Sequence, residues 1–211
     1  MKYSVKEIYY TLQGEGALTG TPAVFCRFTG CNLWSGLEED RETAACNFCD
    51  TDFVGTDGRG GGVFEDACAL AAAVEDKWPA LYSKAGRLVV CTGGEPLLQL
   101  DAEAIRALHD NGFGVAIETN GTLLPPAGVD WICVSPKSSD LILREGEELK
   151  LVFPQESLTP EHFDTLEFGH FFLQPMDGPE LEKNTRLALE YCLANPLWKL
   201  SLQSHKLWRG A

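Results

Sequence analysis

Basic residues are scarce in this sequence. The 211 residues contain 17 lysines and arginines against 31 aspartates and glutamates, which gives a formal charge of −14. No stripe of Lys and Arg with interleaved aromatic residues appears along the chain, and nucleic-acid binding relies on such a stripe because it must neutralise phosphates. We therefore expect no nucleic acid among the direct partners.

Long apolar runs are missing as well. No segment approaches the roughly 18 apolar residues that a membrane-spanning helix needs, and the opening residues MKYSVKEIYY lack the apolar core of a signal peptide. These absences predict a cytoplasmic protein without a membrane partner. A hydrophobic content of 45% over 211 residues suffices for one sizeable core, so we expect a single domain over residues 1–211.

Histidine is scarce, whereas cysteine is not. The four histidines form no closely spaced pair that would complete a four-ligand zinc site. A reduced cytosolic chain of this size also has no need of disulfides. Of the eight cysteines, five lie in apolar runs or helix-like patterns and are expected to be small buried hydrophobic side chains: Cys26, Cys68, Cys91, Cys133 and Cys192.

The other three cysteines lie in loop-like sequence rich in Gly, Asn and Asp. Cys46 and Cys49 form a C-x2-C pair, and Cys31 precedes that pair by fourteen intervening residues. By itself a C-x2-C pair is ambiguous among a zinc knuckle, a redox dithiol and an iron–sulfur site. Three cysteines without an evident fourth ligand favour a cubane cluster with one iron open to a ligand from outside the protein.

Short apolar runs alternate with helix-like stretches, which is typical of repeated strand–helix units in a mainly parallel α/β fold. The expected strands are Ala23–Phe28, Leu88–Cys91, Val115–Glu118, Trp131–Ser135, Leu149–Phe153, Phe171–Gln174 and Lys199–Leu202. The expected helices are Phe64–Trp78, Asp101–Asn111, Pro160–Leu166 and Glu180–Ala194, the third capped by Thr159. Because the stretch between Glu118 and Trp131 is too short for a full helix, we expect an incomplete barrel.

Polar or glycine-rich segments follow most of these strands, among them TGCNL, TGGEP, SPKS and QPMDG. In parallel α/β architectures this carboxyl edge is where ligands bind. Ordinary turn chemistry explains Gly and Asn there, but it does not explain a cysteine cluster, an acid and a lysine on one edge. Residues 55–62, GTDGRGGG, hold five glycines in eight and predict a flexible connection.

The stretch LQGEGALTGTPAVFCRFTGCNLW, the pair CNFCDT and the segment TGGEP resemble the radical S-adenosylmethionine superfamily and, within it, the 7-carboxy-7-deazaguanine synthase family. The likeness extends over nearly the whole chain and includes SPK at 135–137, LQPMDG at 173–178 and LQSHK at 202–206. The superfamily's usual motif is C-x3-C-x2-C. Here the first gap is expanded, and we expect residues from about 32 to 45 to form a small helical insertion in the cluster loop.

The resemblance implies three cofactors, namely a [4Fe–4S] cluster, S-adenosylmethionine on its open iron, and Mg²⁺. It implies that the cluster is bound by Cys31, Cys46 and Cys49, and that Mg²⁺ is bound by Thr51. The implied S-adenosylmethionine contacts are Asn47, Phe48, Asp50, Gly93, Gly94, Glu95, Glu118, Asn120, Ser135, Pro136, Lys137, Ser138, Gln174, Pro175, Met176 and Asp177. In the TGGEP segment the glycines permit close backbone approach, and Glu95 is an acceptor for the amine of the cofactor.

The resemblance also implies a pterin substrate. The reaction would convert 6-carboxy-5,6,7,8-tetrahydropterin into 7-carboxy-7-deazaguanine with loss of ammonia, in queuosine and deazapurine synthesis. The implied substrate contacts are Leu12, Gln13, Gly14, Glu15, Arg27, Thr92, His205 and the terminal residue Ala211. Arg27 is supported by its own strand, AVFCRF, in which an unpaired charge is costly and a carboxylate partner is expected.

The same likeness implies a homodimer and a flavodoxin-type reductant. Two alternative functions remain open at this point. A glycyl-radical-enzyme activase shares the cluster, the cofactor and the barrel, but it acts on a protein chain and has no use for Arg27 with the QGEG and QSHK segments. A non-catalytic iron–sulfur or zinc module explains the cysteines but neither TGGEP nor SPK. Formation of 5′-deoxyadenosine and consumption of the carboxypterin separate the three.

Overall fold

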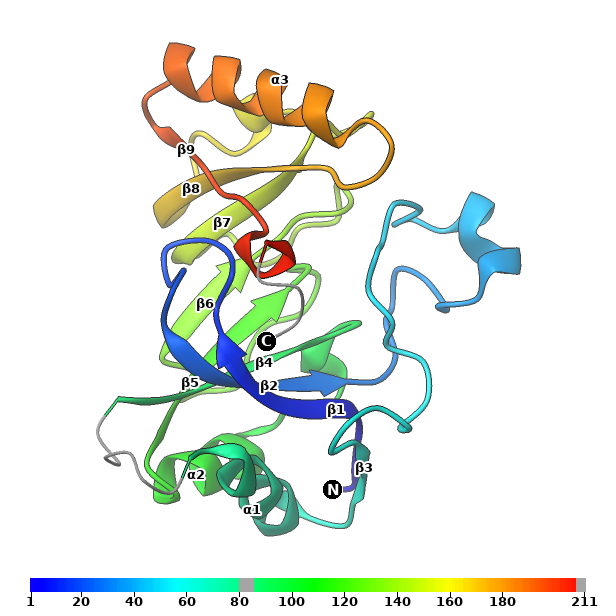
Figure 1. Cartoon of the computed structure of the whole chain (residues 1–211), viewed down its shortest axis with the longest axis vertical. Coiled ribbons are helices and arrows are strands. Elements are labelled where there is room, and N and C mark those ends of the chain that lie inside the picture. Colours follow the sequence, from blue (N-terminus) through cyan, green and yellow to red (C-terminus); the bar gives the residue numbers. More distant parts are fainter. Residues whose placement is uncertain (80–85, 208–211) are drawn as a thin grey trace.

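The computed structural model describes residues 1–79 and 86–207 as one sheet with helices packed against it (Figure 1). The nine strands are ordered β3-β1-β2-β4-β5-β6-β7-β8-β9. Their bounds are β1 Tyr3–Leu12, β2 Pro22–Phe28, β3 Gly62–Phe64, β4 Arg87–Gly93, β5 Phe113–Thr119, β6 Trp131–Val134, β7 Glu145–Phe153, β8 Glu167–Pro175 and β9 Trp198–Leu200. From β2 to β9 neighbouring strands run parallel, whereas β1 pairs antiparallel with β2 and β3.

Three α-helices cover the sheet in the part of the chain that the structure describes. They are α1 Ala67–Lys77, α2 Ala102–Asp110 and α3 Leu181–Ala194. The shorter 3-10 turns are η1 Glu38–Thr43, η2 Pro96–Leu98, η3 Pro160–His162 and η4 Ser204–Lys206. Asp66 and Asp101 cap α1 and α2 because their carboxylates accept from the Ala69 and Ala104 N–H groups. None of these helices is long and apolar enough to cross a membrane.

The expected α/β fold is confirmed, and each of the seven expected strands lies in the parallel part of the sheet. The helix expected over Pro160–Leu166 is wrong. Only the single turn η3 forms, with Thr159 before it and Pro160 at its start. Phe163, the next residue, is buried at 4% exposure in the core to which α3 contributes Ala188. So short a segment gains too few internal hydrogen bonds to hold a longer helix.

Strand β1 has no counterpart among the expected strands, and a bulge explains why. Its pairing with β2 passes from Val5 opposite Phe28 to Glu7 opposite Arg27, so Lys6 is an extra residue in the ladder. Before the bulge the odd-numbered residues face the core, as Val5 does. After the bulge the even-numbered residues face it, as Ile8 does. The strand therefore lacks one continuous alternation of apolar and polar residues.

The glycine-rich stretch 55–62 lies against this bulge. Gly58 N–H donates to the Lys6 carbonyl at 3.0 Å, and Ile8 N–H donates to the Arg59 carbonyl at 2.9 Å. A Cβ at Gly61 would lie 2.1 Å from the Lys6 carbonyl oxygen, so only glycine permits this approach. We expected this segment to be a flexible connection. These contacts instead hold it against β1.

Parallel strands give the sheet two different faces, since side chains alternate along each strand. Val24, Val89, Val115 and Ile117 point toward α1 and α2 and belong to the main core. The alternate residues of the same strands face the other way: Ala23, Phe25, Val90 and Ala116 form a small apolar cluster there. Toward the carboxyl ends of the strands this face becomes polar, with Arg27, Thr92 and Glu118. That alternation explains why charged residues stand inside otherwise apolar strands, and it creates the wall of the site described next.

Candidate active site

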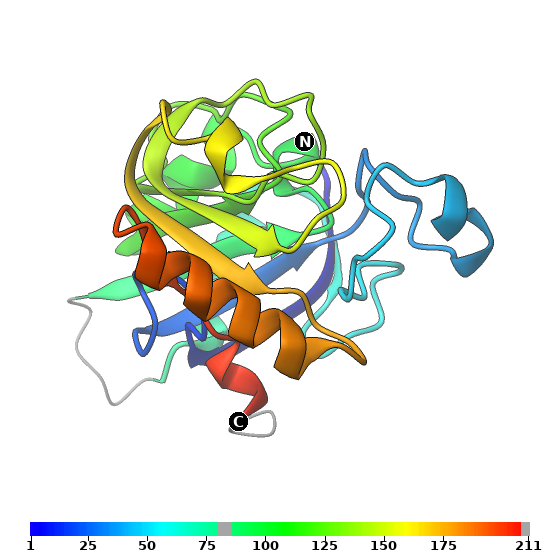
Figure 2. The same ribbon diagram turned by 90° about the horizontal axis from the view of Figure 1, so that it is seen from above.

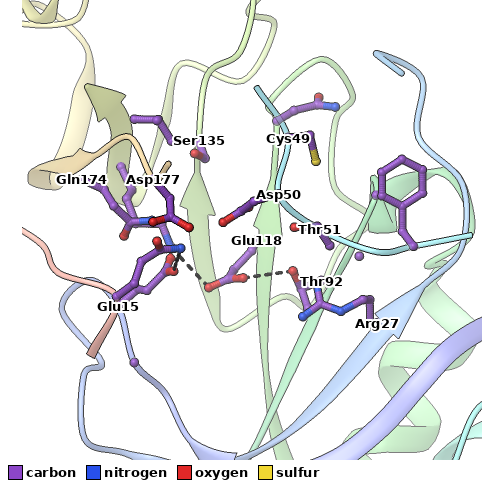
Figure 3. Close-up of a pocket in the computed structure, with 18 of the residues that line it drawn as sticks. Glu15, Arg27, Cys49, Asp50, Thr51, Thr92, Glu118, Ser135, Gln174 and Asp177 are labelled. Atoms are coloured by element: carbon purple, nitrogen blue, oxygen red, sulfur yellow. Dashed lines mark hydrogen bonds and ion pairs between the residues drawn. The ribbon is translucent and has the colours of Figure 1, made fainter. Parts of the chain in front are cut away.

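A cleft of about 650 Å³ lies over the polar face of the sheet, at the carboxyl ends of the parallel strands. Figure 3 shows side chains from both halves of the sheet and from the loop after β2 converging on it. Cys49, Asp50 and Thr51 stand on one side, and Gln174 and Asp177 stand on the other. The cleft therefore joins the cysteine loop to the end of β8.

Most of the predicted site residues line this cleft. The predicted residues that line it are Leu12, Gln13, Gly14, Glu15, Arg27, Cys31, Cys46, Phe48, Cys49, Asp50, Thr51, Thr92, Gly93, Gly94, Glu118, Asn120, Ser135, Lys137, Gln174, Pro175, Met176, Asp177 and His205. Four others, Asn47, Glu95, Pro136 and Ser138, lie beside it without lining it. Ala211 lies outside the described residues.

The three loop cysteines share one side of the cleft. Cys46 is 4% exposed, while Cys31 and Cys49 are half-buried. The Cys46 thiol donates a hydrogen bond to the Cys49 sulfur; this bond lowers the pKa of Cys49 to about 6 and raises the pKa of Cys46. A thiolate is the form that binds metals, so the lowered pKa of Cys49 favours metal binding there.

The thiols do not converge on one point. Over the described residues, no three His, Cys, Asp or Glu side chains are arranged to hold a single metal ion. In a cubane cluster each thiolate binds a different iron, so its ligands surround the cluster instead of meeting at one atom. Three thiols that line one cleft provide such a donor set.

The segment between Cys31 and Cys46 projects to one side of the sheet, where both views show η1 (Figure 1, Figure 2). Trp34 anchors it from within, being 7% exposed and packed edge-on against Phe53 at 5.6 Å between ring centroids. Arg41 lies over the Trp34 ring at 4.1 Å and donates to the carbonyls of Asn47 and Cys49, both at 3.0 Å. The insertion thus holds the backbone of the C-x2-C pair through Arg41.

Arg41→Met should loosen that pair. The substitution keeps some stacking on Trp34 but removes the two charge-assisted bonds to the loop carbonyls. We expect the thiols of the metal-free protein to react with a thiol reagent about tenfold faster, the factor that corresponds to about 1.4 kcal/mol. Arg186→Met, on the exposed face of α3, is the matched control. Identical labelling rates for Arg41→Met and the unaltered protein would contradict the supporting role.

Gly93 and Gly94 end β4 directly beside the first cysteine. Gly93 has a φ of +142°, and a Cβ there would lie 2.2 Å from the Phe28 carbonyl oxygen. A Cβ at Gly94 would lie 2.1 Å from the Gly30 carbonyl oxygen and 2.8 Å from the Cys31 Cβ. The two glycines are therefore required for the loop that carries Cys31 to pack against β4, and they leave bare backbone on the cleft wall.

The carboxylate of Glu95 is held by groups of the protein beside the cleft. Glu95 is fully buried and accepts hydrogen bonds from the Thr119 hydroxyl at 2.8 Å, the Asn120 N–H at 2.8 Å and the Leu97 N–H at 3.0 Å. Burial raises the pKa of Glu95, and these bonds oppose that shift. The side chain joins the turn after β4 to the end of β5, so its partners lie within the protein.

Glu118 is the central acceptor of the cleft floor. One of its oxygens accepts from Gln13 at 3.1 Å. The other accepts from the Thr92 hydroxyl at 3.0 Å (Figure 3). Arg27 lies nearby and donates to Glu7 at 2.9 Å and to the Tyr9 hydroxyl at 3.4 Å. The carboxylate partner that we expected for Arg27 is thus Glu7. It comes from β1, a strand that the sequence did not predict.

A buried lysine completes the floor. Lys150 of β7 is 4% exposed, and its ammonium lies 2.6 Å from Glu15 and 3.4 Å from Glu118. Burial opposes ionisation of Glu15, but Lys150 and a hydrogen bond from Gln203 outweigh it and lower the pKa of Glu15 to about 2. The sequence reasoning missed Lys150, although one lysine inside the apolar run LKLVF is the signal that would have found it.

Lys137 stands between the cysteines and the floor. It donates to the Ser135 hydroxyl at 2.7 Å and lies 5.6 Å from the centre of the Phe48 ring. Burial lowers the pKa of Lys137, although the thiols of Cys46 and Cys49 oppose that shift. The predicted SPK segment therefore presents its lysine to the cleft, where an anionic group would favour the charged form of Lys137.

The described part of the C-terminal tail lies across the cleft mouth. Ser204 donates to the Gly14 carbonyl through its backbone at 3.0 Å and through its hydroxyl at 2.7 Å. Lys206 bonds Asp177 at 2.5 Å and Asp50 at 3.2 Å, and it thereby links the β8 loop to the cysteine loop. A Cβ at Gly14 would lie 2.5 Å from the His205 ring. The tail is docked as far as Lys206.

Comparison with known proteins places this arrangement in a family. No family model matches the chain. The 7-carboxy-7-deazaguanine synthase of Caulobacter vibrioides is 63% identical over 207 residues, 98% of each chain. The enzyme of the same name from Bordetella pertussis is 62% identical over 98% of each chain. The chain belongs to the 7-carboxy-7-deazaguanine synthase family.

A solved structure agrees with the sequence relatives. The crystal structure of QueE from Escherichia coli matches with a TM-score of 0.70 and 28% identity, over 97% of this chain and 95% of that one. As a member of the 7-carboxy-7-deazaguanine synthase family the protein is an enzyme. The predicted membership of the 7-carboxy-7-deazaguanine synthase family is confirmed.

Proposed function

We propose that the cleft binds a [4Fe–4S] cluster, S-adenosylmethionine and 6-carboxy-5,6,7,8-tetrahydropterin together, and that the enzyme converts the pterin into 7-carboxy-7-deazaguanine with loss of ammonia. The observation that supports this most is that three thiols, the bare backbone of Gly93 and Gly94, and a charged floor line one cleft. A glycyl-radical activase would need a groove for a protein chain, and this cleft is crossed by the docked tail at Lys206.

The cluster would be held by Cys31, Cys46 and Cys49. When bound, the cluster and S-adenosylmethionine supply one-electron chemistry that activates a carbon–hydrogen bond of the substrate. In this proposal Lys137 contributes positive charge beside the carboxylate of S-adenosylmethionine, and Gln174 and Asp177 contact the cofactor from the end of β8. Phe48 and Met176 line the cleft and help to exclude water.

The pterin would occupy the floor between Arg27 and the tail. Arg27 carries five N–H donors, and its two bonds within the described residues leave others for the substrate carboxylate. Glu118, Thr92 and Gln13 form one connected set of hydrogen bonds, so a ligand on the floor meets groups that are already oriented. Such preorganisation favours reaction because little reordering accompanies binding.

Anaerobic reconstitution with iron and sulfide, followed by reduction with S-adenosylmethionine and the carboxypterin, tests the proposal. We expect 5′-deoxyadenosine and 7-carboxy-7-deazaguanine to form together. Absence of 5′-deoxyadenosine would eliminate the radical chemistry. Formation of 5′-deoxyadenosine without consumption of the pterin would favour a different substrate, the activase among them.

Magnesium dependence tests Thr51, which lines the cleft directly after the cysteine pair. In the proposal its hydroxyl binds Mg²⁺ together with water and substrate oxygens, as this ion prefers. We expect magnesium to raise turnover. For Thr51→Val we expect the magnesium concentration that gives half-maximal stimulation of turnover to be roughly tenfold higher. Thr165→Val, at an exposed position, is the control. Superimposable magnesium titrations would remove Thr51 from the site.

The remaining parts of the proposal concern the surroundings of the enzyme. We infer that the open sheet is an incomplete barrel of the superfamily type, with its cleft at the carboxyl edge of the strands. We also infer a homodimer, a flavodoxin-type reductant and a cytoplasmic location. Sedimentation of the purified protein and reduction assays with purified flavodoxin test the first two of these three.

A further inference from the structure

Lys150 is the buried cation at the centre of the cleft floor. Strand β7 runs from Glu145 to Phe153, and the neighbours Leu149 and Leu151 are fully buried in the core on the other face. Alternation along the strand therefore turns Lys150 toward the cleft, where its side chain is 5% exposed. A charge so far from water is costly unless it is paired.

Its partners come from different elements of the fold. The ammonium lies 2.6 Å from Glu15, in the loop after β1, and 3.4 Å from Glu118, at the end of β5. The charged or titratable groups that face this pair from the elements packed around it are Cys133, Lys137, Glu148 and His205. Glu148 is itself engaged, since it accepts from the Ala17 N–H at 2.8 Å.

We propose that Lys150 is a positioning residue that holds the carboxylates of Glu15 and Glu118 as a fixed pair of acceptors for the ring N–H donors of the substrate. This inference rests on the proposed function. An ionised carboxylate offers roughly four acceptor sites. Glu15 uses its sites on Lys150 and Gln203. Glu118 uses three of its own on Gln13, Thr92 and Lys150. Each carboxylate therefore keeps capacity for a ligand.

The aminopyrimidinone edge of a pterin matches this arrangement. Its 2-amino group and ring N–H are neighbouring donors, and a carboxylate accepts such a pair in the geometry that it uses for a guanidinium fork. A protonated carboxyl would present a donor of its own and disrupt the match. Two carboxylates that share a buried site cannot both stay ionised without a cation. Lys150 supplies that cation and leaves the acceptors facing the cleft.

Lys150→Met is the decisive variant, because methionine fills similar space without the charge. Without Lys150, burial raises the pKa of Glu15 and only Gln203 and His205 oppose it, so the protonated fraction of Glu15 grows as the pH falls. In the unaltered enzyme, where the pKa of Glu15 is about 2, no such change occurs as the pH falls from 8.5 to 6. Binding of the pterin should weaken about tenfold at neutral pH and further as the pH falls.

The measurement is anaerobic titration of the reconstituted enzyme with 6-carboxytetrahydropterin between pH 6 and 8.5, with iron content and thermal unfolding recorded for each variant. Lys150→Arg should restore a flat pH profile because it restores the cation. Adding Glu15→Gln to Lys150→Met should reduce the pH dependence, since position 15 no longer titrates. Lys183→Met, with its exposed lysine on α3, is the matched control and should bind as the unaltered enzyme does.

The outcomes separate this inference from the proposed function. If the unaltered enzyme does not bind the pterin, the proposed function fails. If it binds and Lys150→Met binds equally well, or more weakly by the same factor at every pH, the inference on Lys150 fails. A loss that grows toward low pH, is relieved by Lys150→Arg and is reduced by Glu15→Gln supports it. If only Lys150→Met loses iron or unfolds early, the test rests on Lys150→Arg. The pterin affinity of that variant must then be independent of pH.

Discussion

Alanine at any one of Cys31, Cys46 or Cys49 is expected to abolish assembly of the iron–sulfur cluster. These three thiols line one wall of the cleft, and Cys46 already shares a hydrogen bond with Cys49. A cubane with three protein ligands has no substitute when one is lost, because its fourth iron must stay open for the cofactor. We expect iron content after anaerobic reconstitution to fall to background in each variant, together with the visible absorption of the cluster.

Two further cysteines serve as matched controls. Cys68 is exposed on α1 and Cys192 is half-buried on α3, and neither lines the cleft. Cys68→Ala and Cys192→Ala should retain full iron content. Equal iron content in all five variants would refute the ligand assignment. Loss of iron from a control variant would indicate that cluster content depends on general stability instead of on three particular thiols.

The parallel part of the fold was predictable because it depends on local alternation and on connection lengths. Strands such as LVVC, VAIE and WICVS are apolar runs bounded by turn residues, and each becomes a strand of the sheet. The carboxyl edge then follows from the parallel arrangement, so the loop residues after those strands were correctly gathered into one site. This is why the cysteine loop, TGGEP and SPK meet in the cleft.

The antiparallel edge was not predictable for an equally physical reason. The bulge at Lys6 changes which residues of β1 face the core, so no single period describes the strand. The same bulge turns Glu7 and Tyr9 toward the cleft, where both bond Arg27. Sequence reasoning correctly inferred that Arg27 needs a carboxylate, but only the pairing of β1 with β2 identifies Glu7 as one.

Charge pairs between distant segments were also not predictable from the sequence. Lys150 and Glu15 are 135 residues apart in the chain and meet at 2.6 Å, and Lys206 reaches Asp50 across 156 residues. Neither pair has a local signature beyond an isolated charge. Glu95 differs, because the motif TGGEP marks it in the sequence, whereas its bonds to Thr119 and Asn120 are visible only in the structure.

Glu95→Ala is expected to destabilise the protein before any cofactor is added. The carboxylate is fully buried and accepts from Thr119, Asn120 and Leu97. Alanine leaves these three donors without an acceptor, and each buried unsatisfied group costs about 1–3 kcal/mol. We expect the free energy of unfolding of the metal-free protein, measured with urea, to fall by about 4 kcal/mol. Glu95→Gln keeps one acceptor oxygen and should lose about half of that.

The pH dependence gives a second signature of Glu95. Burial raises its pKa in the folded state above the ordinary value of 4.5, so the folded protein binds a proton that the unfolded chain releases. Stability should therefore fall as the pH rises through the window above 4.5, and Glu95→Gln should flatten that slope because glutamine does not titrate. Glu103→Ala, exposed on α2, is the control and should change neither quantity. A residue that served only the cofactor amine would leave the metal-free protein as stable as before, so unchanged urea midpoints in Glu95→Ala would overturn the structural assignment.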